Sequence, residues 1–152
     1  MSEQKQQNYD IKKLRIMILG YNDFTISVIN KFIEESSSIS IVCNLREIPE
    51  IHKKRFLDKN NINFHQTSNS LTNDFENAKI KECDLFLAIT KSDLLNIIAV
   101  QIVQNIFHIS KNKAICLINN GNLAKIYINM GIKCINTSDL ITQNISNQLD
   151  RQ

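Results

Sequence analysis

The sequence predicts a doubly wound parallel α/β sheet of about six strands, folded as a single domain. Two observations predict it: short runs rich in Ile, Val and Leu recur along the 152 residues, and segments with apolar residues at helical spacing separate them. The apolar runs lack polar alternation, which indicates strands buried on both faces, as in a parallel sheet. Strands that alternate with helices of roughly 8 to 15 residues form right-handed βαβ units, so helices are expected on both faces.

The first half of the domain begins with a strand, a helix and a second strand. Residues 14–19 predict a central strand that ends at Gly20. An amphipathic helix follows over residues 24–33, with Asn22 or Asp23 as its N-cap. We expect the serine run at residues 36–38 to end this helix and residues 39–43 to form the second strand. The remaining elements of this half are a helix that begins at Pro49 and carries Ile51, Phe56 and Leu57, a strand at residues 62–64, and a short helix at residues 73–80.

The second half is dominated by a strand at residues 85–89 and a long helix that Ser92 caps. The apolar residues of the segment 94–107 form a band wide enough for two contact surfaces, so we expect this helix to contribute a dimer interface through positions such as Ile98. The later elements are a strand at residues 114–118, a helix at 122–130 closed by Gly131, a strand at 132–135 and a helix at 138–149. The domain thus covers residues 14–149, after a polar N-terminal tail at residues 1–13.

Composition excludes several functional classes. Eighteen Lys and Arg residues against 15 Asp and Glu give a net charge of +3, too small and dispersed an excess for a nucleic-acid surface. No apolar run is long enough to span a membrane, and the polar start lacks a secretory signal, so we expect a cytoplasmic protein. The four cysteines include no C-x-x-C pair, so we expect buried thiols with no metal site and no disulfide framework.

Polar residues follow the strands at the edge where ligands bind in this architecture. Ligands of doubly wound sheets lie beyond the carboxyl ends of the strands, where the strand order reverses. We therefore expect the ends of the first, second, fourth and fifth strands to lie along a single rim. The candidate ligand-binding residues are Gly20, Asn22, Asp23, Asn44, Thr90, Ser92, Asp93, Asn96 and Asn119.

The end of the first strand carries a reduced dinucleotide fingerprint. Residues 20–25 occupy the place of G-x-G-x-x-G but keep only the first glycine, with Asn22 and Thr25 at the other two positions. Asp23 has a carboxylate that is expected to lie at the helix N-terminus, where a phosphate otherwise binds. Two interpretations stay open here, a plain N-cap and a phosphate site. After the second strand, Cys43 and Asn44 stand where a ribose-binding acid is usual.

At the fourth strand the chain resembles a known family. Residues 84–97 (DLFLAITKSDLLNI) are similar to the fourth-strand motif of the TrkA N-terminal domain, the RCK domain that regulates potassium channels and transporters. The similarity continues through residues 114–120 and 130–132 and covers about residues 14–147. The resemblance implies a Rossmann-like fold and a divergent family member.

The resemblance also implies a function and partners. It implies a non-catalytic cytosolic regulatory subunit of a potassium uptake system that senses NAD(H), ATP or ADP. Such a subunit forms a homodimer or higher homo-oligomer and docks on a membrane-embedded potassium transporter subunit at the inner face of the cell membrane. Family members usually carry a further C-terminal ligand-binding domain, which this chain is expected to lack.

Two other functions remain open on the sequence. One is a remnant of a nucleotide-dependent oxidoreductase, for which Asp93 and His65 are the available acid or base candidates. The other is a dimerising structural module whose pocket is filled by its own side chains. Because no catalytic constellation is visible, the sequence favours the regulator over the enzyme.

Overall fold

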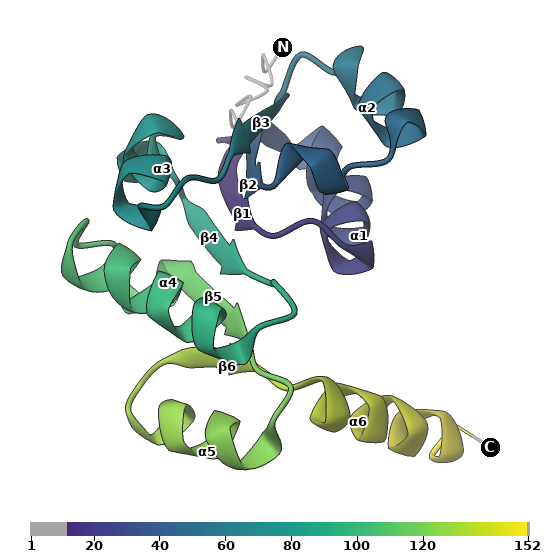
Figure 1. Ribbon diagram of the computed structural model, residues 1–152. Helices are drawn as coiled ribbons and strands as arrows, with labels where there is room; N and C mark the ends of the chain where they lie inside the picture. The colour runs from purple at the N-terminus through teal and green to yellow at the C-terminus, as the bar shows by residue number, and fades with distance from the viewer. Residues whose placement is uncertain (1–11, 152) are drawn as a thin grey trace, which may run out of the picture.

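Six parallel strands form one sheet in the order β3-β2-β1-β4-β5-β6, and this confirms the predicted doubly wound architecture (Figure 1). The structure, a computed structural model, describes residues 12–151, so most of the predicted tail at residues 1–13 lies outside the described residues. The chain order reverses between β1 and β4, which are neighbours in the sheet. The strands are β1 (Leu14–Leu19), β2 (Ser36–Cys43), β3 (Ile62–Gln66), β4 (Leu85–Ala88), β5 (Ala114–Leu117) and β6 (Lys133–Ile135).

Helices cover both faces of the sheet. Helices α1 and α2 pack on one face through Ile29 and Phe56, and α3, α4 and α5 pack on the other through Phe75, Val100 and Ala124 (Figure 1). This division follows from right-handed crossovers that run outward from β1 in one direction and from β4 in the other. The helices are α1 (Asp23–Phe32), α2 (Glu50–Leu57), α3 (Leu71–Asn77), α4 (Asp93–Asn105), α5 (Gly121–Asn129) and α6 (Thr137–Leu149).

The central strand β1 is buried on both faces, which explains its continuous apolar sequence. Ile16 and Ile18 pack with α1 and α2, whereas Met17 and Leu19 pack with α3 and α4. All four side chains are at most 2% exposed. Burial of one such side chain stabilises the fold by about 1.5–3 kcal/mol. The strand therefore holds the first residues of the candidate site, which directly follow it, in a fixed position.

The structure corrects three expectations about the helices and strands. The serines at residues 36–38 do not end a helix; they open β2, where Ser36 pairs with Leu14 and Ser38 with Arg15 of β1. Helix α2 buries Phe56, whereas Ile51 and Leu57, which were expected on its apolar side, are exposed. Helix α3 begins at Leu71, two residues earlier than expected, because Ser70 caps it.

The last helix stands apart from the rest of the fold. Helix α6 leaves β6 and runs away from the sheet, with the C-terminus at its far end (Figure 1). None of its residues is buried. A helix of this length is marginally stable in water without packing partners.

Candidate functional site

The reversal point of the sheet carries a crevice at the carboxyl ends of β1 and β2. It encloses about 700 Å³. Its floor is apolar, and its walls come from the loops after β1, β2, β3 and β4. The lining residues are Leu19, Gly20, Tyr21, Asn22, Val42, Cys43, Asn44, Glu47, Thr67, Thr90, Lys91, Ser92 and Leu95.

Gly20 lets the loop after β1 pass close to the loop after β4. Its φ is +111°, a backbone conformation that L side chains rarely adopt. A Cβ at this position would lie 3.1 Å from both the backbone N and the Cγ2 of Thr90. The close approach of these two loops therefore requires glycine, in agreement with its place at the start of the reduced fingerprint.

Asn22 caps helix α1 and joins it to β4. Its Oδ1 accepts hydrogen bonds from the backbone N–H groups of Phe24 (2.9 Å) and Thr25 (3.3 Å). Its Nδ2 donates to the carbonyl oxygen of Ile89 (2.6 Å), and Thr25 Oγ1 accepts from the Asn22 N–H (3.1 Å). Of the two expected N-cap candidates, Asn22 is therefore the cap, and Asp23 is an exposed residue of the first turn.

Asn96 ties the ends of β4 and β5 together from inside the fold. This side chain is fully buried, although it is an amide. Its Oδ1 accepts from the N–H (2.9 Å) and Oγ1 (2.6 Å) of Thr90, and its Nδ2 donates to the carbonyl oxygens of Thr90 (3.0 Å) and Leu117 (2.9 Å). All of its hydrogen-bonding capacity thus goes to the protein, so its role is to position the rim.

Two further polar side chains extend this network along the rim. The Asp93 carboxylate accepts from the N–H groups of Asn119 (2.8 Å) and Asn120 (2.9 Å), so the first turn of α4 holds the loop after β5. Asn136, buried after β6, donates through Nδ2 to the carbonyl oxygens of Ile118 (2.9 Å) and Asn119 (3.2 Å). Asn136 is also the N-cap of α6, so the network connects Thr90 to the start of the projecting helix.

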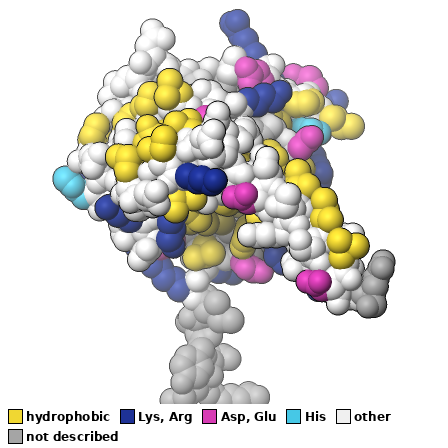
Figure 2. All heavy atoms as spheres, turned by 90° about the horizontal axis from the view of Figure 1, so that it is seen from below, with side chains coloured by type: hydrophobic (Ala, Val, Ile, Leu, Met, Phe, Trp, Pro, Cys, Tyr) yellow, Lys and Arg dark blue, Asp and Glu magenta, His cyan; other side chains and the backbone are white. Residues whose placement is uncertain are grey.

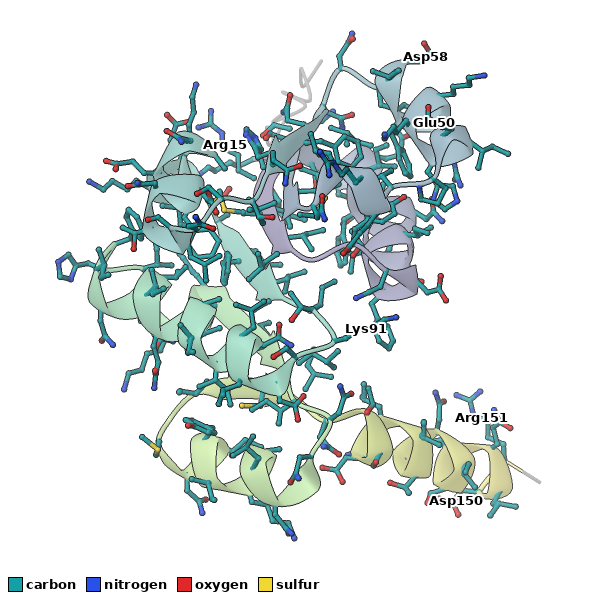
Figure 3. All side chains as sticks on the ribbon, viewed as in Figure 1. Arg15, Glu50, Asp58, Lys91, Asp150 and Arg151 are labelled. Carbon is teal, nitrogen blue, oxygen red and sulfur yellow. The ribbon has the colours of Figure 1, made fainter. Side chains whose placement is uncertain are left out.

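A second hollow lies beside the crevice, at the ends of β4 and β5. It encloses about 320 Å³ and shares Asn22, Thr90 and Lys91 with the crevice. Lys91 lies on the loop between β4 and α4 (Figure 3). The shared residues form a ridge between the two hollows. The other residues of the second hollow are Asp23, Phe24, Leu117 and Asn119.

The structure brings most of the predicted site residues to this one rim. Those that line the crevice are Gly20, Asn22, Asn44, Thr90 and Ser92; Asp23 and Asn119 line the second hollow, and Asp93 and Asn96 line neither. The expected common rim of Gly20, Asn44, Thr90 and Asn119 is therefore found across two adjoining hollows.

Sequence reasoning missed one carboxylate of the crevice, that of Glu47. It lies in η2 (Leu45–Glu47), a short 3-10 turn that Asn44 starts by accepting a hydrogen bond from Arg46 N–H (3.1 Å). The Glu47 side chain is exposed, and among residues 12–151 no side chain forms an ion pair with its carboxylate. The signal in the sequence is an Asx-type turn directly after the second strand, which brings the third residue back over the strand end.

Burial raises the pKa values of a thiol and a phenol that line the crevice. Burial, together with the nearby Glu47 charge, raises the pKa of the Cys43 thiol to about 11. Burial also raises the pKa of Tyr21, whose hydroxyl lies 2.8 Å from Nδ1 of His52. Cys43 is therefore a neutral thiol at physiological pH, unlike the thiolates of nucleophilic cysteines.

The rim fits one part of a dinucleotide and not another. A pyrophosphate normally binds the free N–H groups at the first turn of α1, but Asn22 Oδ1 already accepts from two of them. The exposed Asp23 carboxylate adds negative charge at the same turn. The residues present therefore do not fit a pyrophosphate, whereas the crevice over β1 and β2 keeps an apolar floor and an unpaired carboxylate.

Comparisons with known proteins agree with the fold. The family model described as the TrkA-N domain matches residues 16–137. The X-ray structure of Pen from Bacillus thuringiensis is similar at a TM-score of 0.52 and 17% sequence identity, over 71% of this chain and 38% of that chain. The chain thus spans well under half the length of that structure, and the likeness shows the fold alone. No curated protein matches the chain.

Proposed function

The chain belongs to the TrkA-N domain family, and on this premise we propose that it is a non-catalytic regulatory domain of a potassium transport system. In this role it works in the cytosol beside a membrane-embedded transporter subunit and responds to a nucleotide-type ligand. The observation that carries the proposal is the crevice at the reversal point of the sheet, lined by Gly20, Asn44 and Thr90. No helix within residues 12–151 has the length and apolar character to cross a membrane.

The hydrogen bonds of the rim support a regulator rather than an oxidoreductase. Of the two acid or base candidates, Asp93 accepts hydrogen bonds from two backbone N–H groups through its carboxylate. His65 lines hollows at β3 that are separate from the crevice. Burial lowers the pKa of His65, which favours its neutral form. Neither side chain is placed to exchange a proton with a ligand in the crevice.

The rim network supports a route from the crevice to the last helix. Thr90 lines the crevice and is bound to Asn96, which also binds the end of β5. The loop after β5 is bound in turn to Asn136, the cap of α6. A ligand that moves Thr90 acts on a connected set of buried hydrogen bonds that ends at this helix. Regulation requires such differential contacts between two states.

Helix α6 supports self-association through a second copy of the chain. Leu140, Ile141, Ile145 and Leu149 are each at least 50% exposed. Ile141, Ile145 and Leu149 follow one another at a spacing of four residues and so form one stripe along the helix, with Leu140 next to Ile141 in the sequence. Figure 2 shows apolar side chains in a row along the arm that leads to the C-terminus. The second hollow offers a further exposed apolar side chain, that of Phe24. The same two surfaces on a second copy allow a symmetric exchange of contacts, as a twofold dimer requires.

The expected interface on the long helix is only partly available. Ile97, Val100 and Val103 of α4 pack into the core, whereas Leu94 and Ile98 remain exposed. The buried side of α4 is thus used within the fold, and the outward apolar side that is left for a partner is the narrower of the two. We accordingly propose α6 as the principal dimer contact and α4 as a secondary one.

The oligomeric state of charge variants tests this interface. Ile145→Lys places a charge in the α6 stripe and should shift the chain from dimer to monomer in sedimentation velocity. The circular-dichroism signal of the helices that pack on the sheet should be kept. The matched control is Gln143→Lys, which adds the same charge on the opposite side of α6. A dimer retained by Ile145→Lys and lost in Ile98→Lys would move the contact to α4; a monomeric wild type would overturn the self-association proposal.

Thermal unfolding with adenine nucleotides tests the ligand. A ligand present at 100 times its Kd stabilises the folded state by about 2.7 kcal/mol. For a chain of this size that corresponds to a rise in Tm of about 5–10 °C. A rise with any of adenosine, AMP, ADP, ATP or NAD supports a ligand-responsive regulator. No rise with all of them would favour the structural module instead.

A further inference from the structure

The side chain of Asn22 lies across the middle of the rim and is held there by hydrogen bonds. Its Oδ1 and Nδ2 are both engaged, the first with two N–H groups of α1 and the second with the carbonyl oxygen of Ile89 at the end of β4. The backbone of the same residue is held by Thr25 Oγ1, which itself donates to the Gly20 carbonyl oxygen (2.9 Å). Three hydrogen bonds thus hold the Asn22 side chain between α1 and the end of β4, and two further ones fix the backbone around it.

The Asn22 side chain lies between two hollows that a dinucleotide would have to span. The crevice lies over β1 and β2, and the smaller hollow lies over β4 and β5. A molecule with one nucleoside in each half must pass its pyrophosphate over Asn22, where the N–H groups of α1 are already bonded. Lys91 is the one basic side chain among the described residues that line either hollow, against the acidic Glu47 and Asp23. The rim therefore offers little for two or three phosphates.

The crevice alone offers the chemistry that a nucleoside needs. The apolar lining against which a flat base can pack consists of the half-buried Leu95 together with Leu19 and Val42, which are buried at the ends of their strands. The free carboxylate of Glu47 is an acceptor for the vicinal hydroxyl groups of a ribose, the role that an acid near the end of the second strand has in nucleotide sites of this architecture. At about 700 Å³ the crevice lies within the usual size of a small-molecule site.

We propose that the crevice binds a nucleoside that carries at most one phosphate, with its ribose on Glu47, and that Asn22 excludes dinucleotides and nucleoside polyphosphates. This inference rests on the proposed function, because it specifies the ligand of the same site. It also reassigns the reduced fingerprint: Asn22 and Thr25 are the parts of a closed cap that replaces the phosphate of a bound dinucleotide.

Isothermal titration of the full chain with adenosine, AMP, ATP and NAD tests the proposal. The wild type should bind adenosine and AMP at least tenfold more tightly than ATP and NAD. Glu47→Gln should weaken adenosine binding at least fivefold and 2′-deoxyadenosine binding less. The control Glu34→Gln removes the same charge near the amino end of β2, away from the crevice, and should leave both affinities unchanged.

Substitution of Asn22 tests the exclusion directly. Asn22→Gly frees the N–H groups of Phe24 and Thr25 from the Asn22 side chain and should raise the ratio of NAD affinity to adenosine affinity at least tenfold. Asn22→Ser keeps a cap on the same helix, so it should not gain NAD binding. Both variants are first checked for a cooperative thermal transition.

The outcomes separate this inference from the proposed function. If the wild type binds ATP or NAD as tightly as AMP, or if Glu47→Gln binds adenosine normally, the inference is wrong and the ligand-responsive regulator stands. If no probe binds the wild type or Asn22→Gly, the crevice is not a nucleotide site, and both are overturned.

Discussion

Replacement of Asn96 by alanine should destabilise the fold more than any other single polar substitution on the rim. The side chain is fully buried and forms four hydrogen bonds, three with Thr90 and one with the carbonyl oxygen of Leu117. Each intramolecular hydrogen bond contributes about 0.5–1.5 kcal/mol net, and buried groups left without partners cost more. We therefore expect Asn96→Ala to lower the free energy of unfolding by about 3 kcal/mol, within a range of about 2–5 kcal/mol.

Urea unfolding followed by circular dichroism measures this loss. With an m value of about 2 kcal/mol/M, a loss of 3 kcal/mol moves the midpoint down by about 1.5 M. The matched control is Asn105→Ala, an exposed asparagine at the end of the same helix, which should change stability by less than about 0.5 kcal/mol. A loss of about 1 kcal/mol or less in Asn96→Ala would refute the reasoning, because it would mean that water replaces the amide at no cost.

Two further predictions concern the loop after β1 and the floor of the crevice. Gly20→Ala should destabilise the fold by more than about 1 kcal/mol, because it combines a positive φ with a Cβ 3.1 Å from Thr90 N. The control Gly121→Ala, with open space around the added Cβ, should be neutral or slightly stabilising. Thermal unfolding compares the two variants, and equal effects would contradict the close approach of the loops. Because the pKa of Cys43 is raised to about 11 from an ordinary value of 9.0, its contribution to stability is full below pH 9 and is lost as the pH rises toward 11. The stability of the wild type should therefore fall more steeply than that of Cys43→Ala across this interval in urea unfolding at graded pH, and parallel curves would contradict the burial of the thiol.

The sheet was predictable because its central strands are buried on both faces. Ile16 to Leu19 face opposite helix layers, and this leaves an apolar run in the sequence that few other structures produce. The serines at residues 36–38 were misread because serine favours turns, whereas pairing with β1 overrides that preference. Tertiary pairing of this kind leaves no local signal.

The rim was predictable in position and less so in role. Parallel strands bring their carboxyl ends to one edge, so Gly20, Asn44 and Thr90 had to meet. Which of Asn22 and Asp23 caps α1 depends on a shift of one residue in the start of the helix, and both residue types are good caps. The fully internal role of Asn96 depends on the carbonyl of Leu117, which is 21 residues away in sequence and therefore outside any local motif.

A crystal structure of the chain grown with adenosine tests the central claim most directly. We expect the base over Leu19 and Val42, the ribose hydroxyl groups within hydrogen-bond distance of the Glu47 carboxylate, and Asn22 still bonded to Ile89. A nucleoside in the hollow over β4 and β5, or an Asn22 side chain turned away from both α1 and β4, would contradict the account.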